Sequence, residues 1–151
     1  MIENLFSLKG KVALVTGGAK GIGAMITRGL VESGVKVYIS SRSVDACSAY
    51  ATEMSQYGTC VAMPADLMAV ENIDTLVAKL SENETQIDIL INNSGATWGA
   101  PIESFPEKGW DKVMDLNVKS VFFLTKSLLP LLKAGATKAD PSRVILSLIH
   151  I

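Results

Sequence analysis

Short apolar runs alternate with longer segments of helical pattern along the whole chain of 151 residues. The runs, each with the length of a strand, lie at 11–16, 35–40, 59–64, 87–92 and 142–146. The helical patterns between them lie at 21–33, 43–57, 69–83 and 106–133. Strands separated by helix-length segments favour βαβ units, and strands that are apolar throughout are typical of a sheet covered on both faces. We therefore predict an α/β fold with a doubly wound parallel sheet, whose ligands bind beyond the carboxyl ends of the strands.

Composition narrows the class of protein further. Fourteen Lys and Arg residues against fifteen Asp and Glu give a net charge of −1, so a basic face for nucleic acid is not expected. No apolar run reaches the roughly 18 residues of a membrane span, and the first residues do not resemble a secretory signal. Cys47 and Cys60 form no metal or redox motif, and the single histidine is His150. We expect a cytoplasmic protein with two buried free thiols, no metal site, and neither nucleic acid nor membrane as a partner.

A glycine-rich loop follows the first expected strand. It reads Thr16-Gly17-Gly18-Ala19-Lys20-Gly21-Ile22-Gly23 and leads directly into a helical pattern. Glycines allow a tight turn and a close approach to a pyrophosphate, while the helix N-terminus supplies free N–H groups and the positive end of a dipole. A tight structural turn is the alternative reading. In this strand–loop–helix context the loop predicts a dinucleotide site.

The end of the second expected strand indicates which dinucleotide binds. An NAD enzyme usually places an Asp or Glu there to bind the ribose 2′-hydroxyl, but the run 39–43 reads Ile-Ser-Ser-Arg-Ser. Arg42 can pair with a 2′-phosphate, Ser41 adds a small donor, and Lys20 of the glycine loop could add a second cation. Each cation could also be an ordinary solvated charge. Because both loops converge on one site, we predict NADP rather than NAD.

Four ordered motifs resemble those of the short-chain dehydrogenase/reductase family. Residues 16–23 match its TGxxxGxG signature, and Asp66, just after the third run, resembles its adenine-contacting acid. The sequence Asn92-Asn93-Ser94-Gly95 resembles the NNAG motif with Ser in place of Ala, and Asn117 resembles the asparagine of the catalytic tetrad. The resemblance covers about residues 8–145. Residues 96–101 and the segment around Trp110 look most like 3-oxoacyl reductases, including the rhamnolipid-pathway type, and sugar-acid dehydrogenases.

The resemblance implies a Rossmann fold, an NAD(P)-dependent oxidoreductase acting on CH–OH groups and a homo-oligomeric parent protein with a small carbonyl or alcohol substrate. It assigns a catalytic role to Asn117. Together with the loop analysis it gives these cofactor-binding residues: Thr16, Gly17, Lys20, Gly21, Ile22, Gly23, Ser41, Arg42, Asp66, Leu67, Asn93 and Gly95.

Two of these assignments have structural alternatives. Asp66 could cap the helix expected at 69–83. The period of the last helix puts Asn117 on an apolar stripe with Trp110, Val113, Met114 and Val121, where it could be a core asparagine that satisfies a neighbouring backbone group.

The proton-transfer residues of the family have no counterpart in this chain. The family uses a Ser after the fifth strand and a Tyr-x-x-x-Lys pair, but none of Tyr38, Tyr50 and Tyr57 has Lys four residues later. The ending Leu-Ser-Leu-Ile-His-Ile, at 146–151, matches the translation of a transposon-based sequencing adapter; a genuine fifth strand is the alternative.

We therefore expect residues 1–151 to be a single incomplete dinucleotide-binding domain, truncated after about the fifth strand. It would be the inactive cofactor-binding half of an NADP-dependent carbonyl reductase or alcohol dehydrogenase. A non-catalytic nucleotide-binding module is the alternative. We also expect exposed apolar surface around Val121, Phe122, Leu124 and Leu128, with aggregation as its consequence.

Overall fold

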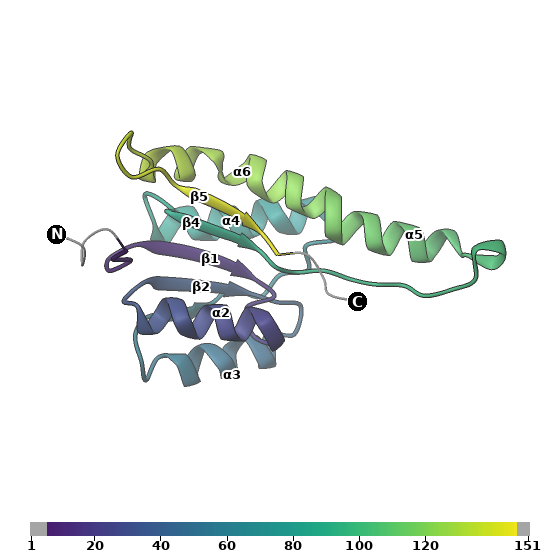
Figure 1. Ribbon diagram of the computed structural model, residues 1–151, viewed down its shortest axis with the longest axis horizontal. Coiled ribbons are helices and arrows are strands. Elements are labelled where there is room, and N and C mark those ends of the chain that lie inside the picture. Colours follow the sequence, from purple (N-terminus) through teal and green to yellow (C-terminus); the bar gives the residue numbers. More distant parts are fainter. Residues whose placement is uncertain (1–5, 148–151) are drawn as a thin grey trace.

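A parallel sheet of five strands, in the order β3-β2-β1-β4-β5, forms the centre of the computed structural model, which describes residues 6–147 (Figure 1). All four strand pairs are parallel. The strands are β1 (Val12–Thr16), β2 (Lys36–Ser40), β3 (Cys60–Ala62), β4 (Ile89–Asn92) and β5 (Arg143–Leu146). The chain runs outward from β1 to β3 and then returns to β4 on the other side of β1, so the predicted doubly wound order is confirmed.

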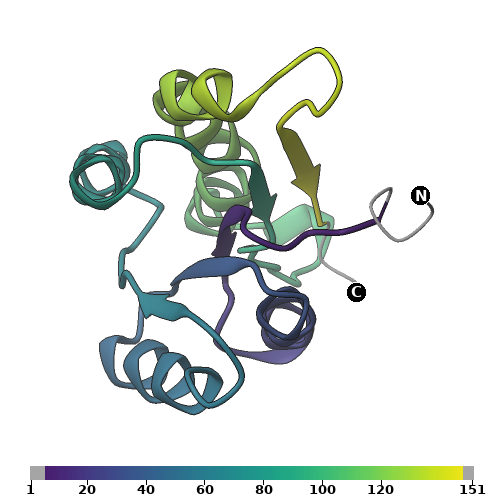
Figure 2. The same ribbon diagram turned by 90° about the vertical axis from the view of Figure 1, so that its left-hand side faces the viewer.

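Helices cover both faces of the sheet (Figure 2). The helices of residues 21–83 are α2 (Gly21–Glu32), α3 (Val44–Met54) and α4 (Val70–Asn83). Those that follow β4 are α5 (Glu107–Met114) and α6 (Ser120–Gly135), preceded by the short 3-10 turn η1 (Ile102–Ser104). Side chains of β1 alternate between two cores: Ala13 and Val15 pack with residues of α2 and α3, whereas Val12 and Leu14 pack with residues of α4 and α6. Burial on both faces explains why the strands are apolar throughout.

The long helix predicted at 106–133 is interrupted. A π-helical turn, η2 (Asp115–Lys119), joins α5 to α6, and the N–H of Ser120 bonds to the carbonyl of Asp115 five residues earlier. The extra residue in this turn rotates the buried side of the helix. The predicted apolar stripe is therefore wrong: Trp110 and Met114 are exposed. The line that is buried consists of Leu116, Ser120, Leu124, Leu128 and Leu132.

The apolar surface expected on this helix is also partly wrong. Leu124 and Leu128 are fully buried in the core that α4 and α6 share, and only Phe122 of the expected group is strongly exposed, at 64%. Both cysteines are buried and free, as predicted. Within residues 6–147, no helix is both long and apolar enough to cross a bilayer.

The amino ends of the central strands are held by charges. Lys11 Nζ lies 2.5 Å from Asp140 Oδ2 and 3.5 Å from Asp88 Oδ1, and Asp88 also accepts a hydrogen bond of 2.8 Å from the N–H of Val12. Arg143 at the start of β5 contacts Asp140 as well. The hydrogen bond to Asp140 raises the pKa of Lys11, and the same bond lowers the pKa of Asp140. This charge clamp (Lys11, Asp88, Asp140 and Arg143) joins β1, β4 and β5 at the edge opposite the carboxyl ends.

Candidate cofactor site

The glycine loop forms a close turn between β1 and α2. Gly17 and Gly21 have positive φ angles of 65° and 53°, which L side chains rarely adopt. A Cβ on Gly23 would lie 2.1 Å from the carbonyl oxygen of Gly17, so the first turn of α2 packs against the loop only because this residue has no side chain. Gly18 is equally constrained, because its Cβ would lie 2.7 Å from Cγ2 of Ile39. Gly21 by contrast has nothing within 4 Å of the place of a Cβ, so backbone is left uncovered at the start of α2.

A hydrogen-bond network ties this turn to the loop that follows β4. The Thr16 hydroxyl oxygen accepts the N–H groups of Asn93 and Ser94, each at 2.9 Å. The Asn93 side-chain amide donates to the carbonyl of Thr16 at 3.0 Å and weakly to that of Gly17 at 3.4 Å. Thr16 itself is buried, with 1% of its surface exposed. Its position therefore supports the two loops from beneath.

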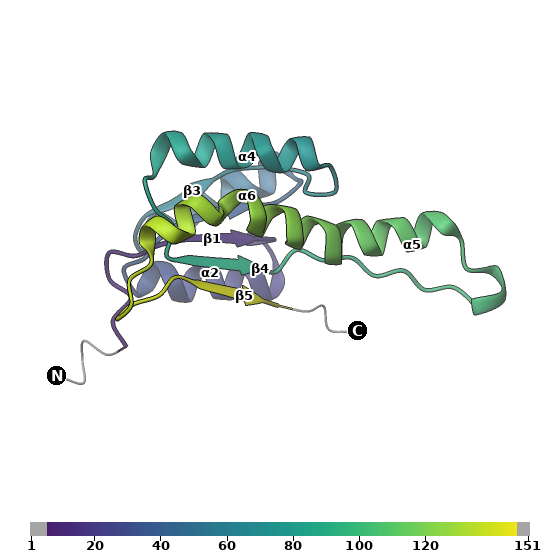
Figure 3. The same ribbon diagram turned by 90° about the horizontal axis from the view of Figure 1, so that it is seen from above.

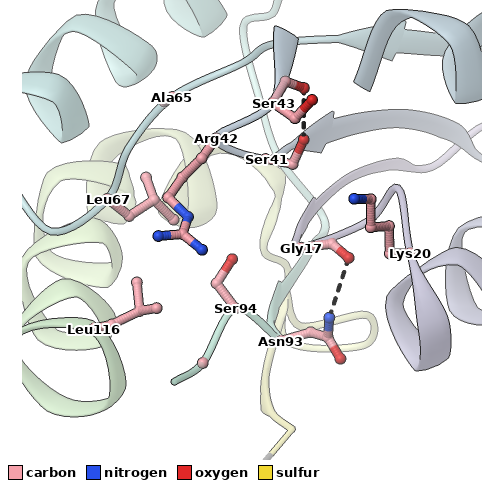
Figure 4. A pocket seen from close by; sticks show the side chains of 11 residues that line it. Gly17, Lys20, Ser41, Arg42, Ser43, Ala65, Leu67, Asn93, Ser94 and Leu116 are labelled. Carbon is pink, nitrogen blue, oxygen red and sulfur yellow. Dashed lines mark hydrogen bonds between the residues drawn. The ribbon is translucent and has the colours of Figure 1, made fainter. Parts of the chain in front are cut away.

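A cavity of about 620 Å³ lies at the carboxyl ends of the strands, beside the glycine turn (Figure 4). β1 is the strand from which the chain runs first to one side and later to the other, so this is the expected crevice of a doubly wound sheet. The lining residues come from the turn, from the ends of β2 and β3, from the loop after β4 and from η2. They are Gly17, Lys20, Ser41, Arg42, Ser43, Ala65, Leu67, Asn93, Ser94, Gly95 and Leu116.

The structure thus brings seven of the predicted cofactor-binding residues into one cavity: Gly17, Lys20, Ser41, Arg42, Leu67, Asn93 and Gly95. In the segment after β2, the hydroxyl groups of Ser41 and Ser43 form hydrogen bonds within the segment and to the start of α3. Ser41 Oγ donates to the carbonyl of Ser43, and Ser43 Oγ accepts the N–H of Ala46 as the cap of α3. Lys20 and Arg42 reach the cavity from different loops (Figure 4).

Other predicted residues lie beside the cavity rather than in it. Gly21, Ile22 and Gly23 form the first turn of α2 and are not among the lining residues. Asp66 is exposed and borders a separate groove between β3 and α4. The alternative role of Asp66 as the cap of this helix is not seen, because the cap position of α4 is Ala69 and the Asp66 carboxylate accepts the N–H of Met68.

Asn117 lies in the π-helical turn and faces the loop after β4. Its side-chain oxygen accepts the N–H of Ala96 at 2.8 Å, and its amide nitrogen donates to the carbonyl of Ala96 at 2.9 Å. The side chain thus satisfies a neighbouring backbone group, which is the structural role that the sequence left open. Asn117 also lines a small second cavity of about 50 Å³, together with Ser94, Gly95 and Ser147.

Four residues that line the main cavity were not predicted from the sequence: Ser43, Ala65, Ser94 and Leu116. Ser43, Ala65 and Ser94 are neighbours of predicted residues, but Leu116 enters only through the π-helical turn. Leu146, in β5, pairs with Asn92 of β4. Residues 148–151, with His150 and most of the suspected adapter segment, lie outside the described residues.

Comparison with known proteins bears directly on this geometry. The sequence model of the short chain dehydrogenase family matches residues 11–145. This chain belongs to that family. The resemblance seen in its four motifs is therefore confirmed, and so is the Rossmann-like sheet.

Two curated relatives illustrate the similarity. The rhamnolipids biosynthesis 3-oxoacyl-[acyl-carrier-protein] reductase of Pseudomonas aeruginosa is 51% identical over 140 residues, covering 93% of this chain and 55% of that protein. The gluconate 5-dehydrogenase of Gluconobacter oxydans is 40% identical over 129 residues, covering 83% of this chain and 49% of that protein. The chain therefore spans about half the length of these relatives.

Solved structures agree with the sequence comparison. The Pseudomonas aeruginosa RhlG/NADP active-site complex superposes with a TM-score of 0.90 at 50% identity, covering 93% of this chain and 55% of that one. A metagenomic short-chain oxidoreductase in complex with NADP gives a TM-score of 0.84 at 30% identity, covering 93% of this chain and 62% of that one.

Proposed function

We propose that this chain binds NADP and forms the cofactor-binding part of an NADP-dependent oxidoreductase that interconverts a carbonyl group and an alcohol. The observation that carries the proposal is the charge of the cavity. Within residues 6–147, the lining includes Lys20 and Arg42 but no Asp or Glu. A 2′-phosphate would meet two cations there and no carboxylate that repels it.

The residues present fit a dinucleotide. Gly21 has open space where a Cβ would stand, so backbone at the start of α2 is uncovered where a pyrophosphate would approach, and the absence of a side chain at Gly23 lets α2 pack against the turn. The cap residue of α2, Lys20, makes no side-chain hydrogen bond to the helix, and the first turn contains no acidic residue. The N–H groups at the start of α2 are therefore not covered by a side chain of the cap or neutralised by a local carboxylate.

The relatives support the class of reaction. One is named as a 3-oxoacyl reductase and another as a gluconate 5-dehydrogenase, and two similar structures are NADP complexes. In the parent protein, which we propose to be a homo-oligomer with a small-molecule substrate, Asn117 would be the one tetrad residue contributed by this chain. We expect the chain by itself to give no turnover, since it contains no Tyr followed four residues later by Lys.

A titration of the purified chain with NADPH and with NADH tests the proposal. We expect NADPH to bind more tightly, and the Arg42→Ala variant to lose about ten-fold or more of its NADPH affinity while NADH affinity changes little. The reason is that only NADPH carries the charged group that Arg42 would bind. Arg28→Ala removes another exposed arginine, one that pairs with Glu32 on α2 instead of lining the cavity, and serves as the matched control. Tighter binding of NADH, or equal losses for both dinucleotides in Arg42→Ala, would contradict the proposal.

A further inference from the structure

Ser94 departs from the motif that surrounds it and has an unused hydroxyl group. It stands third in Asn92-Asn93-Ser94-Gly95, where the matching motif has Ala. Its backbone is fixed, because its N–H donates to the Thr16 hydroxyl oxygen at 2.9 Å. Its own hydroxyl makes no hydrogen bond to any residue among 6–147. The polar atom that distinguishes this chain from the motif therefore has no partner in that part of the protein.

The place of this hydroxyl is well defined. A Cβ built on Gly17 would lie 3.3 Å from Ser94 Oγ, so the hydroxyl lies directly over the glycine turn. Ser94 lines both the large cavity and the small one beside Asn117. In Figure 4 the hydroxyl points into the large cavity, on the side where Arg42 reaches in. Ser94 Oγ thus lies between the turn and Arg42.

The chemistry of the surrounding walls indicates what would lie next to Ser94. Under the proposed function, the pyrophosphate lies at the glycine turn and the 2′-phosphate lies at Arg42 and Lys20. The sugar that carries the 2′-phosphate, the adenosine ribose, joins these two groups. Its oxygens can accept or donate hydrogen bonds, and so can a serine hydroxyl. Leu67 and Leu116 provide apolar surface in the same cavity for the attached base.

We propose that the Ser94 hydroxyl hydrogen-bonds the adenosine ribose of the bound dinucleotide and positions it between the glycine turn and Arg42. This inference rests on the proposed function and adds a residue to that site. A neutral hydrogen bond of this kind corresponds to about a three- to ten-fold change in affinity. Because the ribose is common to both dinucleotides, the hydroxyl strengthens NADPH and NADH binding by the same factor and leaves their ratio unchanged.

Calorimetric titration of the Ser94→Ala variant tests the inference with three probes: NADPH, NADH and 2′,5′-ADP. The last probe carries the phosphorylated adenosine ribose but no nicotinamide. We expect all three to bind about three- to ten-fold more weakly than to the unmodified chain, with an unchanged circular dichroism spectrum, since alanine keeps the N–H bond to Thr16. Ser48→Ala is the matched control, because Ser48 is exposed on α3 and does not line the cavity.

Three results would overturn the inference. One is unchanged affinity of Ser94→Ala for all three probes. Another is a loss for NADPH with none for 2′,5′-ADP, which would put the contact on the nicotinamide side. The third is a weaker affinity for NADPH with an unchanged affinity for NADH, which would put the contact on the 2′-phosphate. If Ser94→Ala fails to fold, Ser94→Cys, which keeps the side-chain size but is a weak donor, is expected to give the same loss. A folded, unmodified chain that binds none of the probes would instead contradict the proposed function.

Discussion

The polar residues at the carboxyl edge of the sheet divide into those that face the cavity and those that build it. Thr16 was predicted from its motif as a cofactor-binding residue, yet it is buried and receives the N–H groups of Asn93 and Ser94. The side-chain amide of Asn117 likewise accepts the N–H of Ala96 and donates to its carbonyl. The motifs predict both residues as functional, but a motif does not separate a ligand contact from a support, because both need a polar side chain at a fixed place.

Thr16→Val tests the supporting role. Valine has nearly the same shape as threonine, but it leaves two N–H groups of the loop after β4 without their acceptor. We expect the free energy of unfolding in urea to fall by about 2 kcal/mol. Thr75→Val is the control, because its hydroxyl is exposed on α4 and bonds only to a carbonyl of its own helix. An equal effect of the two variants would contradict the role of Thr16.

At the scale of elements, α5 and the segment before it project beyond the carboxyl ends of the strands (Figure 3). The indole of Trp98 packs directly on Gly109 of α5, where a Cβ would lie 2.7 Å from the ring. Lys112 also lies over this ring, 5.3 Å from its centre. Together with the bonds between Asn117 and Ala96, this contact holds the loop after β4 against the helix.

Two glycine-to-alanine variants separate this packing from helix propensity. Gly29→Ala, in α2, has open space around the new Cβ and should raise the free energy of unfolding by up to about 1 kcal/mol. Gly109→Ala gains the same propensity but displaces Trp98, so we expect a net loss of stability and a red shift of tryptophan fluorescence. Denaturation monitored by circular dichroism and fluorescence measures both effects. Equal stabilisation by the two substitutions would refute the packing role of Gly109.

Some of the elements could be predicted from the sequence and others could not. The strands and the helices between them follow from apolar runs and helical spacing, which are local properties. The π-helical turn at residues 115–119 could not be predicted this way, because a five-residue turn leaves no repeating pattern and changes the buried side of all that follows. For the same reason Leu116 was missed as a cavity residue. Leu124 was wrongly expected to be exposed because the pattern of this helix does not show that residues of α4 cover it.

At the scale of the whole molecule, the carboxyl ends and the amino ends of the strands carry different structures. The carboxyl edge carries the cavity with Lys20 and Arg42, and the amino edge is joined by the charge clamp. Along the helical segment from α5 to α6, the large apolar side chains that are most exposed are those of Trp110, Val118 and Phe122. Charge therefore organises both edges, while α5 and α6 leave apolar surface open to solvent.

The charge clamp predicts the response to acid. The folded pKa of Asp140 lies below its ordinary value of 3.8, so its contribution is present above that pH and is lost as the pH falls through the folded pKa. The raised pKa of Lys11 keeps its charge to above pH 10.5, so the pair is intact between these limits. We expect Asp140→Asn to lower the thermal midpoint at pH 7 and to have a smaller effect at pH 3. A difference between the variant and the unmodified chain that grows on acidification would contradict this account.

The central claim is that a dinucleotide binds at the carboxyl edge between the glycine turn and Arg42. Nuclear magnetic resonance of the ¹⁵N-labelled chain during addition of NADPH tests it most directly, because each backbone amide reports its own surroundings. We predict that the largest shifts occur at Gly17, Lys20, Arg42 and Ser94, with little change in the charge clamp at the opposite edge. Shifts centred on the groove between β3 and α4, or no saturable shift in a folded sample, would contradict the claim.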